Sequence, residues 1–118
     1  MDDSRHGVDI FLKRNPSTCF VAEHENKLIG AIMVGSDGRR GYIYHTALCA
    51  QYRRQGIASQ LVDTALQALK QCGINKVALV VFDRNKDGNK FWENRGFTVR
   101  EDLIYRNKAI TEMVRIDT

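Results

Sequence analysis

Between residues 18 and 50 the pattern of hydrophobic and polar residues is typical of strands joined by tight turns. Three segments are rich in apolar, β-branched and aromatic residues: 18–25 (TCFVAEHE), 27–36 (KLIGAIMVGS) and 42–50 (YIYHTALCA). The connections at 25–27 and 37–41 contain Asn, Asp and Gly, which favour tight turns. The three strands are therefore predicted to form an antiparallel meander.

From residue 56 onward the apolar positions recur every three to four residues, which is the period of an amphipathic helix. The segment 56–72 carries these residues on one broad stripe, and Gly73 follows as a residue suited to end a helix. An unbroken apolar run at 77–82 (VALVVF) then predicts a strand buried on both faces and parallel to 42–50. The crossover between the two strands is expected to be right-handed.

Two shorter helices and a terminal sheet segment are also expected. A helix at 8–14 should end before Pro16, because the residue preceding a proline disfavours helix. A second helix at about 88–95 should end at Gly96, and one or two strands are expected within 97–116.

The predicted fold is α/β (α+β), with a mixed, mostly antiparallel sheet. Its central parallel strand pair, 42–50 and 77–82, is flanked by helices. The chain of 118 residues has the size of one domain, so 1–118 is expected to be a single domain. No apolar run is long enough to cross a bilayer, and the start MDDSRHG lacks the features of a signal peptide. A cytoplasmic protein with no membrane partner is expected.

The charge and the possible metal ligands exclude several other functions. The net charge is +4, but the sequence has no long run of Lys or Arg, so no specific nucleic-acid partner is expected. Nonspecific binding of nucleic acid by a basic protein is kept as a third hypothesis. Three cysteines lack a C-x-x-C pair and three histidines are scattered, so no metal site is expected.

The segment DRNKDGNKFWEN resembles the start of a calcium-binding loop, because Asp83, Asn85, Asp87 and Gly88 have the spacing D-x-N-x-D-G. A predicted strand precedes it where an EF-hand needs a helix. The twelfth position is Asn94, where the motif needs a bidentate Glu. A polar loop after a buried strand instead suggests a ligand site, because ligands of α/β folds collect at the carboxyl ends of strands.

A second polar segment stands at the corresponding end of strand 42–50. Arg53, Gly56 and Ala58 form R-x-x-G-x-A immediately before the long helix. Glycine lets a ligand approach the backbone, and the unpaired N–H groups of the first helical turn favour an anion such as a pyrophosphate. Arg54 adds positive charge.

These two segments together resemble a known family. LCAQYRRQGIASQLVDTAL followed by NKDGNKFWENRGF is similar to the acetyl-CoA-binding core of the GNAT acyltransferase superfamily, over residues 18 to 108 or so. The resemblance implies that R-x-x-G-x-A holds the CoA pyrophosphate, that the preceding strand pairs with the pantetheine arm, and that Asn85 hydrogen-bonds the pantetheine. The implied cofactor-binding residues are Leu48, Cys49, Ala50, Arg53, Arg54, Gln55, Gly56, Ile57, Ala58, Ser59 and Asn85.

The chain departs from the family pattern in two respects. Trp92 occupies the position where most members carry a Tyr that protonates the departing thiolate. An indole cannot serve as that acid, so packing beside the thioester is the competing interpretation, and Tyr44 or Tyr105 are other possible donors. The family's usual first strand and first helix are missing. Without them, strand 18–25 is either an exposed edge or is covered by a second copy in a homodimer. A start that removed these first elements is the competing explanation.

The resemblance implies transfer of the acetyl group of acetyl-CoA to a primary amine of a small molecule or peptide by direct attack. The alternative is a CoA-binding module with little or no catalysis. Alternation along strand 42–50 would place Tyr44 with Thr46 and Leu48 on one face and His45 on the other. The resemblance implies that the base lies on the face of Leu48, which points to Tyr44, ahead of Tyr42, as the expected base acting through water. It also implies backbone N–H groups of Leu48 and Cys49 as the oxyanion donors. Cys49 is expected to be a buried, inert thiol.

Overall fold

Two hairpins build the antiparallel part of the sheet, as the alternation predicts. In the computed structural model, which describes residues 4–112, β1 (Phe20–His24) pairs antiparallel with β2 (Lys27–Ser36), and β2 with β3 (Gly41–Leu48). Glu25 and Asn26 both have positive φ, 51° and 64°, so the first hairpin has the two-residue turn whose twist suits antiparallel strands.

The long helix α2 (Ile57–Gln71) provides most of the helical side of the core. It buries Leu61, Val62, Ala65 and Leu69, which pack with Ile32, Val34 and Ile43 of the sheet. Burying one such aliphatic side chain stabilises a fold by roughly 1.5–3 kcal/mol. At its end Gly73 adopts φ 83°, and the N–H groups of Gly73 and Ile74 donate to the carbonyls of Lys70 and Leu69. The predicted helix end is confirmed.

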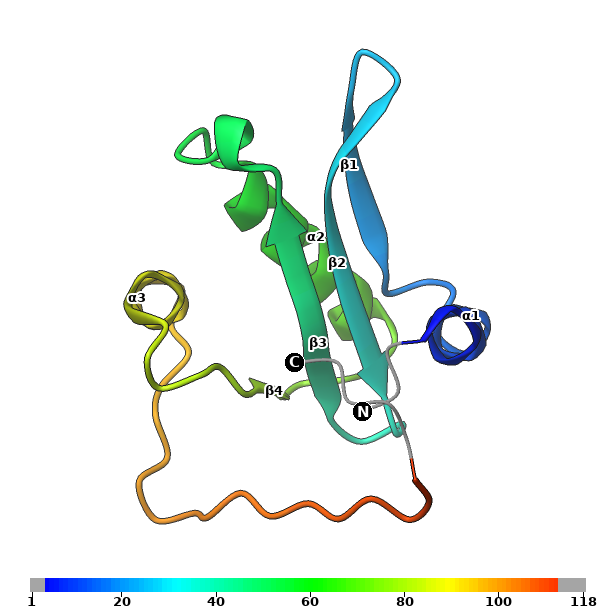
Figure 1. Cartoon of the computed structure of the whole chain (residues 1–118), viewed down its shortest axis with the longest axis vertical. Coiled ribbons are helices and arrows are strands. Elements are labelled where there is room, and N and C mark those ends of the chain that lie inside the picture. The colour runs from blue at the N-terminus through cyan, green and yellow to red at the C-terminus, as the bar shows by residue number, and fades with distance from the viewer. Residues whose placement is uncertain (1–3, 113–118) are drawn as a thin grey trace.

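Strand β4 (Val77–Leu79) pairs parallel with β3 and completes a sheet of order β1-β2-β3-β4 (Figure 1). Figure 1 shows α2 behind this sheet, with α1 (Arg5–Arg14) and α3 (Lys86–Asn94) at its two sides. The mixed α/β fold and the parallel strand pair are therefore confirmed.

The prediction for 77–82 was wrong in length and burial. The strand ends at Leu79, and the side chains of Val80 and Phe82 are exposed. Residues 97–112 form no strand, contrary to prediction, while 113–116 lie outside the described residues. The parallel pair consequently stands at one edge of the described sheet rather than at its centre. An apolar run can be buried on both faces only where neighbouring elements cover it, and local sequence does not encode those neighbours.

Helix α1 begins three residues before the predicted start at residue 8. The side chain of Ser4 accepts a hydrogen bond from the N–H of Gly7 (3.1 Å), so it caps the helix. The helix ends before Asn15 and Pro16, as predicted. Phe11 lies close to Gly35, on the face of the sheet opposite Val34 and α2.

Candidate functional site

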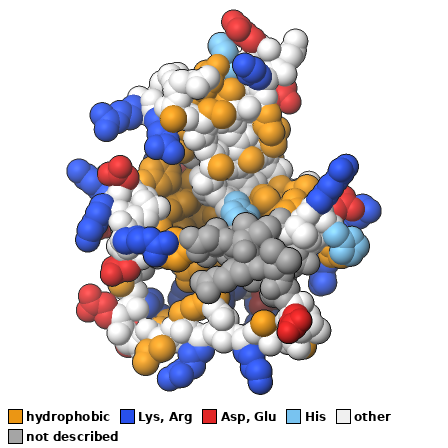
Figure 2. Space-filling model, in the orientation of Figure 1, with side chains coloured by type: hydrophobic (Ala, Val, Ile, Leu, Met, Phe, Trp, Pro, Cys, Tyr) orange, Lys and Arg blue, Asp and Glu red, His pale blue; other side chains and the backbone are white. Residues whose placement is uncertain are grey.

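Strands β3 and β4 separate after a short parallel contact. Their pairing runs from Gly41 and Val77 to Ile43 and Leu79, yet β3 continues to Leu48. Within the described chain, the edge of β3 that faces β4 thus has no strand partner from Tyr44 onward. Figure 2 shows hydrophobic side chains recessed between β3 and α3, the two elements that Figure 1 places on either side of this opening. An extended ligand could pair with the exposed backbone of β3 here.

A β-bulge at Tyr44 lies where the two strands separate. Val34 pairs with Ile43 and Met33 with His45, so Tyr44 has no partner on β2. Such a bulge leaves two residues opposite one and interrupts the alternation of side chains between the two faces.

The predicted assignment of faces on β3 was therefore wrong. Leu48 and Thr46 pair with Gly30 and Ile32, which face α2. Tyr44 lies on the opposite face, where its ring meets the edge of Phe11 at 5.2 Å between centroids. His45, opposite Met33, belongs to that same face. Strand parity no longer separates His45 from Tyr44.

Three aromatic rings gather on this face beside the bulge. Tyr44 contacts Tyr42 with centroids 4.8 Å apart and Phe11 on its other side. Burial, followed by the neighbouring hydroxyls of Tyr105 and Tyr44, raises the pKa of Tyr42. The rings of Phe11, Tyr42 and Tyr44 form an aromatic patch in which Tyr44 is exposed to solvent.

The start of α2 forms an open anion site after β3. A 3-10 turn, η1 (Ala50–Tyr52), leads to Arg53, and Gly56 caps α2 with φ 80°. No side chain caps the helix and no acidic residue occupies its first turn. A Cβ atom on Gly56 would meet nothing within 4 Å, so the backbone is open on that side. Unpaired N–H groups, the helix dipole and two arginines make this end suited to phosphate oxygens.

The structure brings together most of the residues predicted to bind the cofactor. The exposed side chains of Arg53, Arg54 and Gln55 precede the helix, and Ile57, Ala58 and Ser59 make its first turn. Leu48, Cys49 and Ala50 lead into this segment from the open side of β3.

Cys49 differs from its prediction in two ways. It lies beyond the end of β3 and is exposed, not buried within a strand. Its N–H donates to the carbonyl of Ile29 (2.8 Å), so that N–H is already used and is not a free oxyanion donor. The register explains the second fact, because β2 remains hydrogen-bonded to the chain just past the last paired residue, Leu48.

Thr46 was missed by sequence reasoning. Its Oγ1 atom is shielded from solvent and has no hydrogen-bond partner in the described chain. Thr46 lies on β3 beyond the bulge, beside the stretch that β4 leaves unpaired. A buried hydroxyl without a partner is costly, and a ligand in the opening could satisfy it.

Asn85 caps helix α3 on the other side of the opening. Its Oδ1 accepts from the N–H of Gly88 (2.9 Å). The amide of Asn89, which sequence reasoning missed, donates to the carbonyls of Phe82 (3.0 Å) and Asn85 (2.8 Å). Because the helix begins at Lys86, most of the calcium-like segment is helical and cannot wrap a cation as an EF-hand loop does.

Trp92 packs within an aromatic group at the inner side of α3. Its ring meets Phe91 at 4.9 Å and Phe97 at 5.0 Å, both edge to face, and all three rest against the core. This arrangement favours the packing interpretation of Trp92 over the role of an acid.

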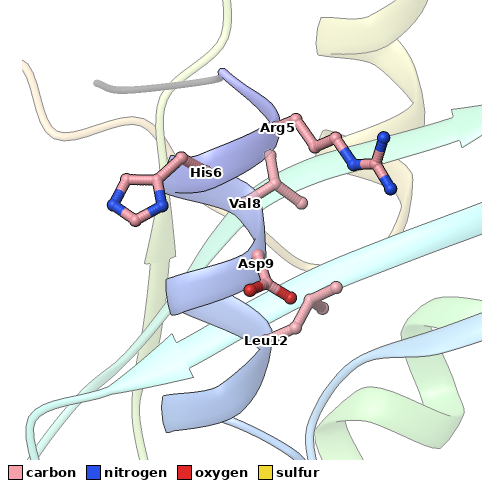
Figure 3. A pocket seen from close by; sticks show the side chains of 5 residues that line it. All are labelled: Arg5, His6, Val8, Asp9 and Leu12. Carbon is pink, nitrogen blue, oxygen red and sulfur yellow. The ribbon is translucent and has the colours of Figure 1, made fainter.

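Two surface hollows lie away from this opening. One, of about 590 Å³, lies along α1 and is lined by Arg5, His6, Val8, Asp9 and Leu12 (Figure 3). The other, of about 460 Å³, lies between β1, η1 and α2, and its lining includes Gln55 and Ile57 of the predicted cofactor segment. Neither includes Tyr44 or Asn85, so the opening beside β3 is the better candidate on chemical grounds. In the described part of the chain no three His, Cys, Asp or Glu side chains gather as a metal site requires, and no helix is long and apolar enough to span a membrane.

Comparison with known proteins agrees with this geometry. N-alpha-acetyltransferase 30 of Xenopus laevis is 36% identical over 101 residues, which cover 81% of this chain and 37% of that protein. The chain therefore spans only about a third of that relative's length. Acetyltransferase SG1711 of Sodalis glossinidius is 27% identical over 111 residues, covering 94% of this chain and 78% of that protein.

The fold is shared with a solved structure, and a family model covers most of the chain. Ard1 of Thermoplasma volcanium superposes with a TM-score of 0.79 at 20% identity, over 85% of this chain and 68% of that one. The model described as the acetyltransferase (GNAT) family matches residues 1–97. The chain belongs to the GNAT family of acetyltransferases.

Proposed function

We propose that this chain transfers the acetyl group of acetyl-CoA to a primary amine by direct attack. The observation that carries the proposal is the uncapped start of α2, with Arg53 and Arg54 beside it, at the end of a strand whose edge β4 leaves open. Membership of the acetyltransferase family supports the same activity. Residues 1–118 would act as one domain.

The residues fit the two polar parts of acetyl-CoA. The first-turn N–H groups of α2 and the arginines would hold the pyrophosphate, since they offer donors and positive charge with no carboxylate in that first turn. The open edge of β3 and the unpartnered Thr46 Oγ1 would face the pantetheine amides. Asn85 caps α3 with one lone pair of its Oδ1, so a contact to the pantetheine would come from its amide nitrogen or from the second lone pair of Oδ1.

The acceptor amine must be neutral when its nitrogen attacks the thioester carbonyl. A C–N bond then forms, the C–S bond breaks, and CoA leaves as a thiolate that takes a proton. Tyr44 is the first candidate to pass the amine's proton to solvent through water, its hydroxyl accepting one proton as it releases its own, because it lies at the bulge beside the opening. Since His45 belongs to the same face, it is the competing base. Trp92 supplies no proton, so water would protonate the thiolate.

Rates of the Tyr44→Phe and His45→Ala variants decide between these bases. We expect Tyr44→Phe to lower kcat by about a hundredfold, the lower end of general base effects, and His45→Ala to lower it far less. The opposite ranking would assign the base to His45.

The α-amine of a peptide is the proposed acceptor. The relatives named N-alpha-acetyltransferase 30 support this class over a small amine. A screen of peptide N-termini, a lysine side-chain analogue and free polyamines, followed by CoA release, tests it. Faster turnover of a polyamine than of every peptide would contradict the peptide assignment.

A CoA-binding module with little catalysis is the alternative, and Trp92 at the expected acid position favours it. Acceptor-dependent release of CoA separates the two. The β1 edge has no strand neighbour in the described chain, so a homodimer through this edge is also proposed. A monomeric mass in light scattering at micromolar concentration would contradict the dimer. The cytoplasmic location stays a prediction.

A further inference from the structure

We infer that Arg95 and Asp63 form a positioning pair that holds α3 against α2 and thereby sets the affinity for acetyl-CoA; this inference rests on the proposed function. Asp63 lies on α2, less than two turns after the capping Gly56. Arg95 is the C-cap of α3. Its Nη2 donates to Asp63 Oδ1, which joins the two helices across 32 positions of sequence.

Helix α3 has little else to hold it in place. It contains no fully buried residue. The residues before it, 80–85, have left the sheet, and those after it, from 97, form no regular element. Its own rings, Phe91 and Trp92, pack against the core. Burial of apolar surface against the core resists withdrawal of a helix better than its sliding, since the hydrophobic effect is not directional.

The Arg95 guanidinium depends on this carboxylate. Its side chain is only 30% exposed, while that of Asp63 is 61% exposed. The Nε atom is shielded and has no hydrogen-bond partner in the described chain. A half-buried cation that loses its carboxylate is left uncompensated, so it would move outward to water and carry the end of α3 with it.

This movement would change the binding site. The first turn of α2 offers the proposed pyrophosphate donors, and the first turn of α3 carries Asn85. The opening lies between β3 and α3, and the start of α2 follows the end of β3, so the position of α3 relative to α2 sets the width of the opening. Arg95 and Asp63 contact no reacting atom, and their role is to position the two helices.

The direction in which Asp63→Asn changes the affinity for acetyl-CoA separates a positioning role from a purely electrostatic one. Asp63→Asn removes a negative charge from the helix that holds an anionic ligand, which by charge alone would tighten acetyl-CoA binding. If Asp63 positions α3, binding should instead weaken about threefold to fivefold, the scale of a partly exposed ion pair. In turnover, KM for acetyl-CoA should rise with kcat nearly unchanged.

Titration calorimetry with acetyl-CoA and hydrogen exchange of Lys86–Asn94 in the free protein test the inference together. Asp63→Asn and Arg95→Gln should weaken binding and speed exchange in α3, and the swap Asp63→Arg/Arg95→Asp should restore both. The control is Asp9→Asn, which breaks the Asp9–Lys13 pair (3.0 Å) within α1 and should change neither.

Several outcomes overturn the inference. Unchanged or tighter binding of acetyl-CoA by Asp63→Asn would overturn it. Faster hydrogen exchange in α3 with unchanged affinity would also overturn it, because the pair would then be purely structural. If the folded wild-type chain binds no acetyl-CoA, the proposed function fails. Hydrogen exchange in α3 then still decides whether the pair holds this helix. Unaltered exchange in Asp63→Asn would show that it does not.

Discussion

At the scale of single residues, Thr18 shows how one buried hydroxyl fixes the chain where it enters the sheet. It is 6% exposed, and its Oγ1 donates to the carbonyl of Val34 at 2.6 Å. Thr18→Val keeps the shape but removes the donor, so the free energy of unfolding should fall by about 1–2 kcal/mol. Urea denaturation measures this. Ser17→Ala, at an exposed neighbour, should stay within about 0.5 kcal/mol of wild type, and equal stability of both variants would contradict the role of the hydroxyl.

Asp37 gives a pH-dependent prediction at the same scale. Its carboxylate accepts from the N–H groups of Arg40 (2.9 Å) and Arg39 (2.8 Å) in the β2–β3 turn, and these bonds lower its pKa. A lowered folded-state pKa stabilises the protein fully above the unfolded pKa of about 3.9, and this stabilisation disappears as the pH falls through the folded pKa.

The stability difference between wild type and Asp37→Ala should therefore be largest near neutral pH and shrink below about pH 4. Urea midpoints of both proteins at several pH values measure it. A difference that grows on acidification would contradict the assignment.

Residue identity did not reveal where the strand pattern breaks. The sequence YIYHTALCA predicts regular alternation, yet the structure places a bulge at Tyr44 that brings His45 to the same face. The bulge depends on how β2 and β3 align at Met33 and Val34, which is a property of two strands together. Tyr44 and His45 could be predicted as candidate bases, but which of them is the better candidate could not.

At the scale of elements, Asn85 determines where α3 starts. Its Oδ1 accepts from the N–H of Gly88, so Asn85→Ala should lower stability by about 1 kcal/mol and speed hydrogen exchange at the start of α3. Asn85→Asp retains an accepting oxygen and should stay near wild type. If both variants behave alike in urea denaturation and exchange, the cap is not what starts the helix.

Elements whose signals are local could be predicted well, and elements that need a distant neighbour could not. The β1–β2 turn at Asn26 and the end of α2 at Gly73 depend on positive φ, which these residues tolerate. The run 77–82 carries a strong apolar signal, but only Val77–Leu79 finds a partner on β3. In 97–112 the apolar residues Val99 and Ile104 are each 78% exposed, so composition alone did not make a strand there.

At the scale of the whole molecule, the candidate site exists because distant elements meet. The anion-binding residues 53–59 could be predicted, since an Arg- and Gly-containing turn before an amphipathic helix is a local pattern. The opening itself could not, because it results from the separation of β3 and β4 and from the position of α3. The tie between Arg95 and Asp63 spans 32 residues and has no local signal.

The most direct test of the account is calorimetric titration of the folded 118-residue chain with acetyl-CoA, beside the variant Arg53→Glu/Gly56→Asp. The matched control is Arg39→Glu/Gly38→Asp, since Gly38 also has positive φ (89°) and open space, but lies in the β2–β3 turn. Saturable binding by wild type and control, weakened on the order of tenfold or more in the first variant, is the predicted result. A folded wild type that does not bind, or equal binding by all three, would contradict the account.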